Sequence, residues 1–318
     1  MIRYAFTLAV VVLGLAVSRD AAAQSRSLRG ELPTSRMLAR FGLERAWWSQ
    51  ATIDTARDEV RYLTIDDESV YVQSSGGTVT SFDIENGNKR WAVQLGRQDD
   101  PSFRVTTNDE IVLVVAGMSM YALEKFSGDP VWELRLPRPP ATGPSLDAKQ
   151  VYFGALDGSL FAFDLKKIGE LHDDNRLPQF TNVAQNWRFK TAGEITAPAQ
   201  SNGSVLSFAS LDNSLYTVSA IERSLQWQFE TDQPVSAPLA IHDGLIFLAS
   251  EDFNIFCIDQ SNGGIRWQFV AGLPVKRQVR VVGNDVFVFP DRGGMYCLNR
   301  ASGTRRWWRP SMEDYVGA

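Results

Sequence analysis

Few residues in this chain of 318 have the type and spacing that metal-dependent or nucleophilic catalysis requires. His172 and His242 are its two histidines, and they form neither an HxH nor an HExxH pair, so the sequence argues against a histidine-rich metal site. No GxSxG elbow and no phosphate-cradling glycine loop is present. The sequence therefore predicts no catalytic residue, no metal site and no cofactor.

The two cysteines, Cys257 and Cys297, are forty residues apart and occupy the same position in two similar stretches. A disulfide would need their Cα atoms to lie within about 7 Å of each other. Earlier copies of the same stretch carry alanine at this position, as Ala122 and Ala162. We therefore interpret both cysteines as small apolar core residues.

The tryptophans reveal the repetition that these cysteines follow. All nine recur at a nearly constant interval, which is 40 residues from Trp187 onward and 43 or 41 residues between Trp48 and Trp132. The interval of 55 residues from Trp132 to Trp187 corresponds to one repeat with a 15-residue insertion. A fixed period of this size marks an array of equivalent units, each too small to bury its own apolar face. We therefore expect the tryptophans to be architectural rather than chemical.

The fifth repeat, residues 234–269, shows what one unit contains. Runs of apolar and small residues, separated by turn residues, predict strands at 235–241, 245–249, 255–258 and 265–269. Four short antiparallel strands in about forty residues form the blade of a β-propeller. Helical repeats would need apolar residues three and four positions apart over a dozen residues, which the frequent turns exclude. The predicted fold is an all-β propeller of four-stranded antiparallel blades, with six complete repeats and an additional N-terminal strand.

The repeats share an eleven-residue signature from the third strand to the tryptophan. It has a small residue, an acidic residue two positions later, glycine at the seventh position and tryptophan at the eleventh. The clearest copies are SFDIENGNKRW (81–91), ALEKFSGDPVW (122–132), CIDQSNGGIRW (257–267) and CLNRASGTRRW (297–307). This signature resembles the tryptophan-docking pattern of PQQ-like propeller repeats. The size and exported character are most similar to the BamB group, propeller scaffolds of outer-membrane barrel assembly.

The resemblance implies that ten residues dock the blades onto one another: Trp91, Trp132, Trp187, Trp227, Trp267, Trp307, Gly87, Gly128, Gly263 and Gly303. The turn glycine allows a positive φ between the third and fourth strands. The large indole can pack against the neighbouring blade while its N–H finds a partner. The fourth repeat departs from the signature, because Ser219 and Arg223 stand where the acid and the glycine are expected.

The same resemblance bears on function. PQQ-dependent enzymes built from such blades are larger and add a pair of adjacent cysteines, calcium ligands and a catalytic aspartate. This chain has no adjacent cysteines and no CxxCH haem site. We therefore expect a non-catalytic, exported scaffold that binds an envelope protein, such as a barrel-assembly component. Two alternatives stay open: a propeller that binds or senses a small ligand at its channel mouth, and a PQQ-dependent quinoprotein enzyme.

Residues 1–23 read as a secretory signal peptide, with Arg3 before an apolar stretch and three alanines at the cleavage site. A lead segment at 24–43, the repeats at 44–309 and a tail at 310–318 follow. No cysteine near the cleavage site supports a lipid anchor, and no later stretch has the length of a transmembrane segment. The net charge of −5, without long charged runs, argues against a nucleic-acid partner. We expect a periplasmic or envelope-associated protein.

Two features could contact a partner or ligand. The insertion at 166–186 has the polar composition of a surface loop, in which Leu177 and Phe180 could form an apolar anchor. Arg104, Lys276 and Arg277 fall on predicted inner strands, where they could attract an anion into the channel. The alternatives are an inert loop and basic residues that pair with local carboxylates.

Closure of the ring is the last expectation. Residues 45–52 (RAWWSQAT) resemble a fourth strand, and in propellers an N-terminal strand often completes the last blade. The nine residues after Arg309 are too few for the three further strands that such a blade would need. We therefore expect an incomplete ring, or part of a seven- or eight-bladed one. A closed ring of six blades is the alternative.

Overall fold

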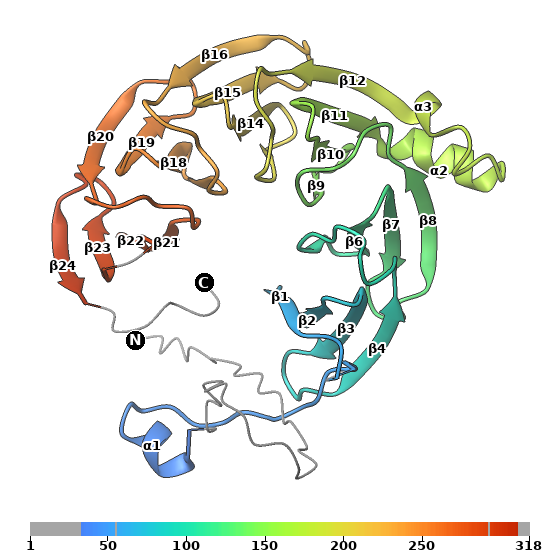
Figure 1. The fold of residues 1–318 in the computed structure, drawn as a ribbon, viewed down its shortest axis with the longest axis horizontal. Coiled ribbons are helices and arrows are strands. Elements are labelled where there is room, and N and C mark those ends of the chain that lie inside the picture. The colour runs from blue at the N-terminus through green and yellow to red at the C-terminus, as the bar shows by residue number, and fades with distance from the viewer. Residues whose placement is uncertain (1–32, 55, 292, 311–318) are drawn as a thin grey trace. The chain divides into compact units, whose positions relative to one another are not determined.

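The computed structural model describes residues 33–54, 56–291 and 293–310 (Figure 1). The predicted signal peptide at 1–23 and all but the first residue of the predicted tail lie outside these residues. The chain divides into two compact units. The first contains the chain up to Asp100 together with Glu124–Asp129, and the second contains Pro101–Leu123 and the chain from Pro130 onward.

Six four-stranded antiparallel sheets, here called blades 1 to 6, follow one another along the sequence, which confirms the predicted β-propeller fold. The first unit begins with the short helix α1 (Ser35–Ala39) and holds blade 1, formed by β1 (Val60–Ile65), β2 (Ser69–Ser74), β3 (Thr78–Asp83) and β4 (Lys89–Gln94).

The second unit holds the other five blades. Blade 2 comprises β5 (Thr106–Thr107), β6 (Ile111–Ala116), β7 (Ser119–Glu124) and β8 (Pro130–Arg135), and blade 3 comprises β9 (Ser145–Leu146), β10 (Gln150–Gly154), β11 (Ser159–Asp164) and β12 (Gln185–Lys190). Blade 4 comprises β13 (Gln200–Ser201), β14 (Val205–Ser210), β15 (Ser214–Ser219) and β16 (Leu225–Glu230). Blade 5 comprises β17 (Ala240–His242), β18 (Leu245–Ala249), β19 (Asn254–Asp259) and β20 (Ile265–Val270), and blade 6 comprises β21 (Arg280–Val282), β22 (Asp285–Val288), β23 (Met295–Asn299) and β24 (Arg305–Arg309). In this unit the fourth strands lie along the outer side (Figure 1).

The burial of the strands follows from their place in the sheet. Central strands such as β2 and β15 are buried along their whole length, because other side chains cover both faces. Fourth strands such as β12 bury their tryptophan and expose the residues on either side of Phe189, as expected where one face packs and the other meets solvent. In the second unit each apolar cluster draws on successive blades, as where Phe247 of blade 5 meets Val286 of blade 6.

Docking tryptophans pack beneath the turn glycine of the following blade. In the first unit Trp91 lies against Gly128, and in the second Trp267 lies against Gly303. A Cβ atom added to either glycine would lie 2.6 Å from the indole Cδ2. Their φ angles are +76° and +68°, in the left-handed region that favours glycine. Both the space and the backbone conformation therefore require glycine.

The turn from the acidic residue to the glycine, here called the docking turn, also receives the indole N–H. Trp91 donates to the Lys125 carbonyl at 2.9 Å, and Trp267 donates to the Arg300 carbonyl at 2.7 Å. Within the turn, the glycine N–H donates back to the carbonyl of the acidic residue, as from Gly263 to Asp259 at 2.9 Å. The Asp259 carboxylate also accepts the Ser261 N–H at 3.0 Å, so the acid of the signature shapes the turn that holds the tryptophan of the preceding blade.

Repeat four keeps this turn with other residues, whereas repeat three departs from it. Arg223 adopts the glycine's left-handed conformation, with φ +58°, and its N–H donates to the Ser219 carbonyl at 2.8 Å. The indole of Trp187 donates within its own blade, to the Gln150 side-chain carbonyl at 2.9 Å, instead of to the docking turn of blade 4. In repeat three, a helix replaces the glycine turn altogether.

That helix corrects the prediction of a polar surface loop at 166–186. The insertion forms α2 (Leu165–Asp173) and α3 (Thr181–Ala184). Ile168 and Leu171 are 0% and 4% exposed and join the apolar cluster that contains Trp132. Apolar residues three positions apart share one helical face, but in this sequence charged residues and Gly169 obscure that pattern.

The inner strands are also shorter than predicted. Strand β17 covers Ala240–His242, whereas the prediction was 235–241, because Pro234 and Pro238 lack the N–H that a sheet ladder needs. Residues 45–52 form no strand with the described residues, which corrects that prediction. Even so, Trp47 packs beneath Gly87 and donates to the Ile84 carbonyl at 2.7 Å, like a fourth-strand tryptophan. How many blades complete the ring stays a prediction.

We expect Trp267→Ala to lower the free energy of unfolding by about 3–5 kcal/mol, as for truncation of a large buried aromatic. The neighbouring exposed residue provides the control, since Gln268→Ala should change it by no more than about 0.5 kcal/mol. Urea unfolding followed by circular dichroism measures both. Equal midpoints for the two variants would contradict the docking geometry.

We expect Ile168→Ala to lower the free energy of unfolding by about 2–5 kcal/mol, because it leaves a cavity between α2 and the blade cluster. A loop of inert decoration would tolerate the change. Lys166, with a side chain 87% exposed on the same helix, is the matched control, and Lys166→Ala should cost no more than about 0.5 kcal/mol. The same urea unfolding experiment tests this prediction. An unaltered midpoint for Ile168→Ala would show that α2 does not pack against the blade cluster.

Candidate functional site

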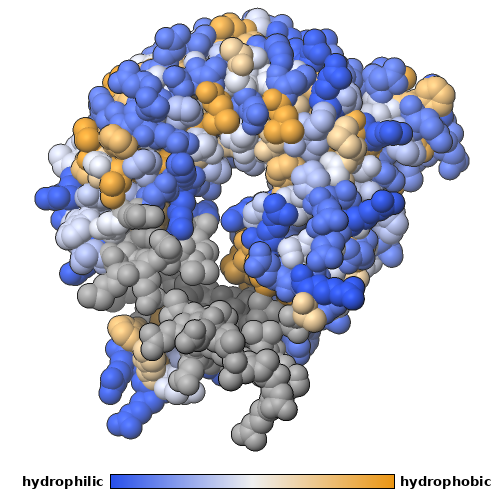
Figure 2. Space-filling model, viewed as in Figure 1, coloured by the Kyte–Doolittle hydropathy of each residue, from blue (hydrophilic) through white to orange (hydrophobic). Residues whose placement is uncertain are grey.

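The helical insertion presents apolar side chains to solvent. Phe180 and Val183 are 45% and 42% exposed, and we call them the insertion surface. The guanidinium of Arg176 lies 4.8 Å from the centre of the Phe180 ring. Figure 2 shows apolar atoms among hydrophilic ones at the outer end of this insertion. Of the two anchor residues predicted here, Phe180 lies on the surface, whereas Leu177 packs against the core and fastens the insertion.

Several hydrogen bonds hold the insertion surface in place. The Phe180 N–H donates to the Arg176 carbonyl at 3.0 Å, and the Val183 N–H donates to the Phe180 carbonyl at 2.9 Å. Between them, the Thr181 hydroxyl donates to the Pro178 carbonyl and accepts the main-chain N–H of Arg135. The surface is therefore ordered before any partner arrives, which reduces the entropy lost on binding.

The predicted basic residues lie ahead of the inner strands rather than on them. Arg104 is exposed before β5, and Lys276 is exposed before β21. Lys276 pairs with the Glu251 carboxylate at 3.4 Å, which is the local pairing considered as the alternative to an anion site. Arg277, next to it, is half-buried. This pairing offsets the charge that would draw an anion to this position.

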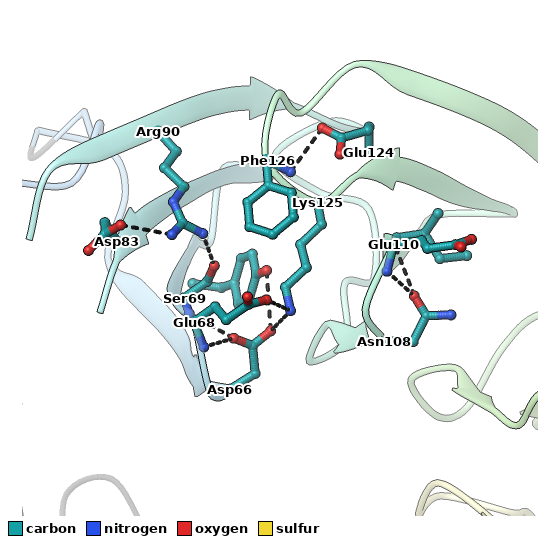
Figure 3. Close-up of polar contacts among 12 residues, drawn as sticks. Asp66, Glu68, Ser69, Asp83, Arg90, Asn108, Glu110, Glu124, Lys125 and Phe126 are labelled. Carbon is teal, nitrogen blue, oxygen red and sulfur yellow. Dashed lines mark hydrogen bonds and ion pairs between the residues drawn. The ribbon is translucent and has the colours of Figure 1, made fainter. Parts of the chain in front are cut away.

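An ion cluster around the buried Lys125 side chain in the first unit was not predicted from the sequence (Figure 3). The Lys125 side chain is 4% exposed, and its ammonium lies 2.8 Å from Glu68 and 3.3 Å from Asp66. The Tyr71 hydroxyl donates to Asp66 at 3.4 Å. Arg90 pairs with Asp83 at 2.8 Å and stacks over the Phe126 ring.

The charge state of Lys125 argues for a structural role. Burial disfavours its charged form, but hydrogen bonds and charge contacts from Glu68 and Asp66 outweigh burial and raise its pKa. Burial also raises the pKa of Tyr71 to about 12. A lysine that acts as a nucleophile needs a lowered pKa, so this cluster is not suited to that chemistry.

The ion pairs of this cluster instead give the docking turn a second contact with the preceding blade. Lys125 follows the acid of its docking turn and reaches carboxylates at the first hairpin of blade 1. Arg300 follows the corresponding residue in blade 6 and pairs with Asp243, at the first hairpin of blade 5, at 2.9 Å. A basic residue at the fourth position of the signature was the sequence signal. It was missed because its partner lies in the preceding repeat.

The cysteines have no reactive environment. Cys257 and Cys297 are both unpaired and buried, in agreement with the interpretation as core residues. Burial raises the pKa of Cys257 to about 11 and raises that of Cys297, so neither thiolate is populated at neutral pH. Within the described part of the chain, no group of three or more His, Cys, Asp or Glu side chains is arranged to hold a metal.

A groove of about 640 Å³ in the second unit is lined by docking residues. Its walls include Asp243 and Arg300, which pair with each other, together with Gln260 and the edge of Trp267. The groove therefore lies beside the blade-to-blade contact, and the Asp243–Arg300 pair in its wall already serves that contact.

The comparisons with known proteins agree with this architecture. A family model described as "Outer membrane protein assembly factor BamB" matches residues 44–119, 100–213 and 211–316. The chain belongs to this family. No curated protein matches the sequence.

Two solved structures show the same fold. The crystal structure of BamB from Moraxella catarrhalis is 20% identical, covers 86% of this chain and 79% of its own, and has a TM-score of 0.63. The computationally designed Ika8 protein is 13% identical, covers 82% and 77%, and has a TM-score of 0.64. At these identities the likeness concerns the fold alone. Among the described residues of this BamB-family chain, no helix is long and apolar enough to cross a membrane.

The docking turn of blade 5 predicts an acid-dependent stability. Hydrogen bonds from Ser261 and Arg266 lower the pKa of Asp259 from 3.8 to about 2. A carboxyl with a lowered folded pKa stabilises the fold above its unfolded pKa, and this stabilisation is lost as the pH falls from about 4 through 2. Asn299 occupies the same position in blade 6, so an amide can shape this turn.

We therefore expect Asp259→Asn to preserve the fold at pH 7. Between pH 4 and pH 2, the melting temperature of the variant should fall by less than that of the wild-type chain. Thermal unfolding at half-unit pH steps measures the difference. Parallel curves for the two proteins over this range would show that Asp259 makes no charge-dependent contact in the folded state.

Proposed function

We propose that this protein is an exported, non-catalytic propeller scaffold that binds an envelope protein and takes part in the assembly of outer-membrane barrels. The observation that carries the proposal is the family match, which extends over nearly all of the repeat region. The signal-peptide-like sequence at residues 1–23 supports export to the compartment where such a partner resides.

The insertion surface is the part of the chain that we assign to partner binding. It combines an exposed phenylalanine with a stacked arginine, and aromatic residues and arginine dominate the binding energy of protein interfaces. It is also rigidly supported, because Ile168 and Leu171 fasten the helix beneath it to the blade cluster. An ordered apolar surface that stands out from a regular array of blades is a suitable contact for another protein.

The chemistry of the buried groups supports a role without catalysis. Lys125 is held in its charged form, and the two thiols are held protonated. The basic residues Arg104, Lys276 and Arg277 support the alternative, a propeller that binds a small anion, less well. The reason is that Lys276 already pairs with Glu251.

We expect the double variant Phe180→Glu, Val183→Glu to lose the partner at least tenfold relative to the wild-type chain. A charge at the centre of an apolar contact should cost about 2 kcal/mol or more, and tenfold corresponds to about 1.4 kcal/mol. The measurement is affinity capture with the wild-type chain and the variant as bait. The extract is detergent-solubilised envelope of the organism to which the protein belongs, and the captured barrel-assembly proteins are quantified. Both side chains are exposed, so the melting temperature should not change.

Ile221→Glu is the matched control, because Ile221 is 72% exposed in the turn between β15 and β16, far along the sequence from the insertion. It should retain the partner. Equal retention by the double variant would remove the insertion surface from the proposal. Failure to retain any envelope protein, with anion binding that is lost in Lys276→Ala, Arg277→Ala, would favour the ligand-binding alternative.

A further inference from the structure

The hairpin between β18 and β19 of blade 5 carries a strained phenylalanine. Phe253 has φ +74°, in the left-handed region that bulky side chains avoid. Of the non-glycine residues with a positive φ in the described chain, Phe253 alone is aromatic. The same position in blades 1, 3, 4 and 6 carries a residue that tolerates this conformation, namely Gly77, Gly158, Asn213 or Gly293. The hairpin therefore favours glycine or asparagine, and phenylalanine lowers the stability of its backbone.

The ring brings the fold little burial in return. The Phe253 side chain is 44% exposed, whereas Phe247, in the strand before the hairpin, is 0% exposed. A strained residue that is not needed for packing is typical of a functional site, where a protein gives up stability for a contact. Phe253 is therefore a candidate contact residue.

Two further exposed apolar side chains lie on the chain segment next to this hairpin. Val270, 64% exposed at the end of β20, pairs in register with Asn254, the residue after Phe253. Leu273, 39% exposed, lies two residues beyond Ala271, whose N–H donates to the Phe253 carbonyl at 2.7 Å. We call Phe253, Val270 and Leu273 the apolar corner of blade 5.

The apolar corner departs from the repeat at all three positions. The position of Val270 is polar in blades 1 to 4, with Gln94, Arg135, Lys190 and Glu230. The position of Leu273 is polar or glycine in the same blades, with Arg97, Arg138, Gly193 and Gln233. The blade architecture therefore does not require apolar residues there. Neighbouring apolar side chains that are exposed without an architectural reason mark a contact surface.

Carboxylates lie beside the apolar corner. The Asp252 carboxylate, next to Phe253, accepts the Asp232 N–H at 3.2 Å, so two acidic residues meet at this edge. Neither pairs with a lysine or an arginine of the described chain, whereas the adjacent Glu251 is balanced by Lys276 at 3.4 Å. The remaining charge is negative. It opposes a second copy of the same edge and attracts a positively charged partner.

We propose that the apolar corner of blade 5 binds a segment of another protein that combines an apolar or aromatic anchor with lysine or arginine. The anchor packs against the exposed side chains of Phe253 and Val270, and the basic residue pairs with Asp252 or Asp232. The apolar corner is separate from the insertion surface, which belongs to blade 3. The inference does not rest on the proposed role in barrel assembly.

The first arm of the test is a selection of binding peptides. Short random peptides displayed on phage are selected on the wild-type chain, after counter-selection on Phe253→Gly. We expect the enriched peptides to combine lysine or arginine with an apolar or aromatic residue. Fluorescence anisotropy should show that Phe253→Gly weakens their affinity about tenfold or more, as for the loss of a central aromatic contact.

Two further variants separate the apolar and the electrostatic parts of the contact. Val270→Gln, which introduces the residue that blade 1 carries at this position, should also weaken binding. The double variant Asp232→Asn, Asp252→Asn should reduce the dependence of affinity on salt concentration, because it removes the charges that attract the peptide. Asn213→Gly is the matched control, since it makes the same kind of change at the same position of blade 4. It should leave binding unchanged.

The second arm asks whether Phe253 serves the fold instead. Phe253→Gly should not lower the urea midpoint, because glycine adopts the left-handed conformation without strain. A midpoint lowered well beyond that of Asn213→Gly would assign the ring to folding and overturn the proposal. The proposal also fails if no peptide is enriched or if the enriched peptides are acidic. A dimer of the wild-type chain in sedimentation that is lost in Phe253→Gly would assign the surface to a second copy instead.

Discussion

The docking of one indole beneath the turn of the next blade is the contact on which this fold depends. A four-stranded blade of about forty residues cannot bury its own apolar face, so its stability comes from its neighbours. The Trp267 side chain meets this need in two ways, because its ring covers apolar area and its N–H satisfies the Arg300 carbonyl. Gly303 is required at the turn because no larger residue leaves room for the ring.

Departures from the signature show which parts of this contact are essential. Arg223 replaces the glycine of repeat four and still adopts its left-handed backbone, so the turn conformation matters more than the residue type. In repeat three, α2 covers Trp132 with Ile168 and Leu171 in place of a turn. Trp91, Trp132, Trp187 and Trp267 are all buried, so a covered indole is what these junctions preserve.

Docking also restricts where function can reside. The Lys125 ion pairs serve a blade contact in the first unit. The groove beside blade 5 is lined in part by the Asp243–Arg300 pair, which serves such a contact in the second unit. Membership of the BamB family is consistent with the proposed scaffold role, because regularly repeated blades are suited to presenting surfaces. The insertion in repeat three extends that array without disturbing it, since its apolar face replaces a docking turn and its outer side remains available to a partner.

The sequence by itself determined the blade architecture, because the spacing of tryptophans, the turn glycines and the apolar runs are all local signals that recur in each repeat. It also predicted the interior cysteines. It did not predict the helix at α2, whose apolar face packs into a cluster built from both blade 2 and blade 3. Nor did it predict the pairing of Lys125 with Glu68, because the partner lies in another repeat. Periodicity reveals the unit, whereas only the tertiary structure shows which faces of the unit are covered.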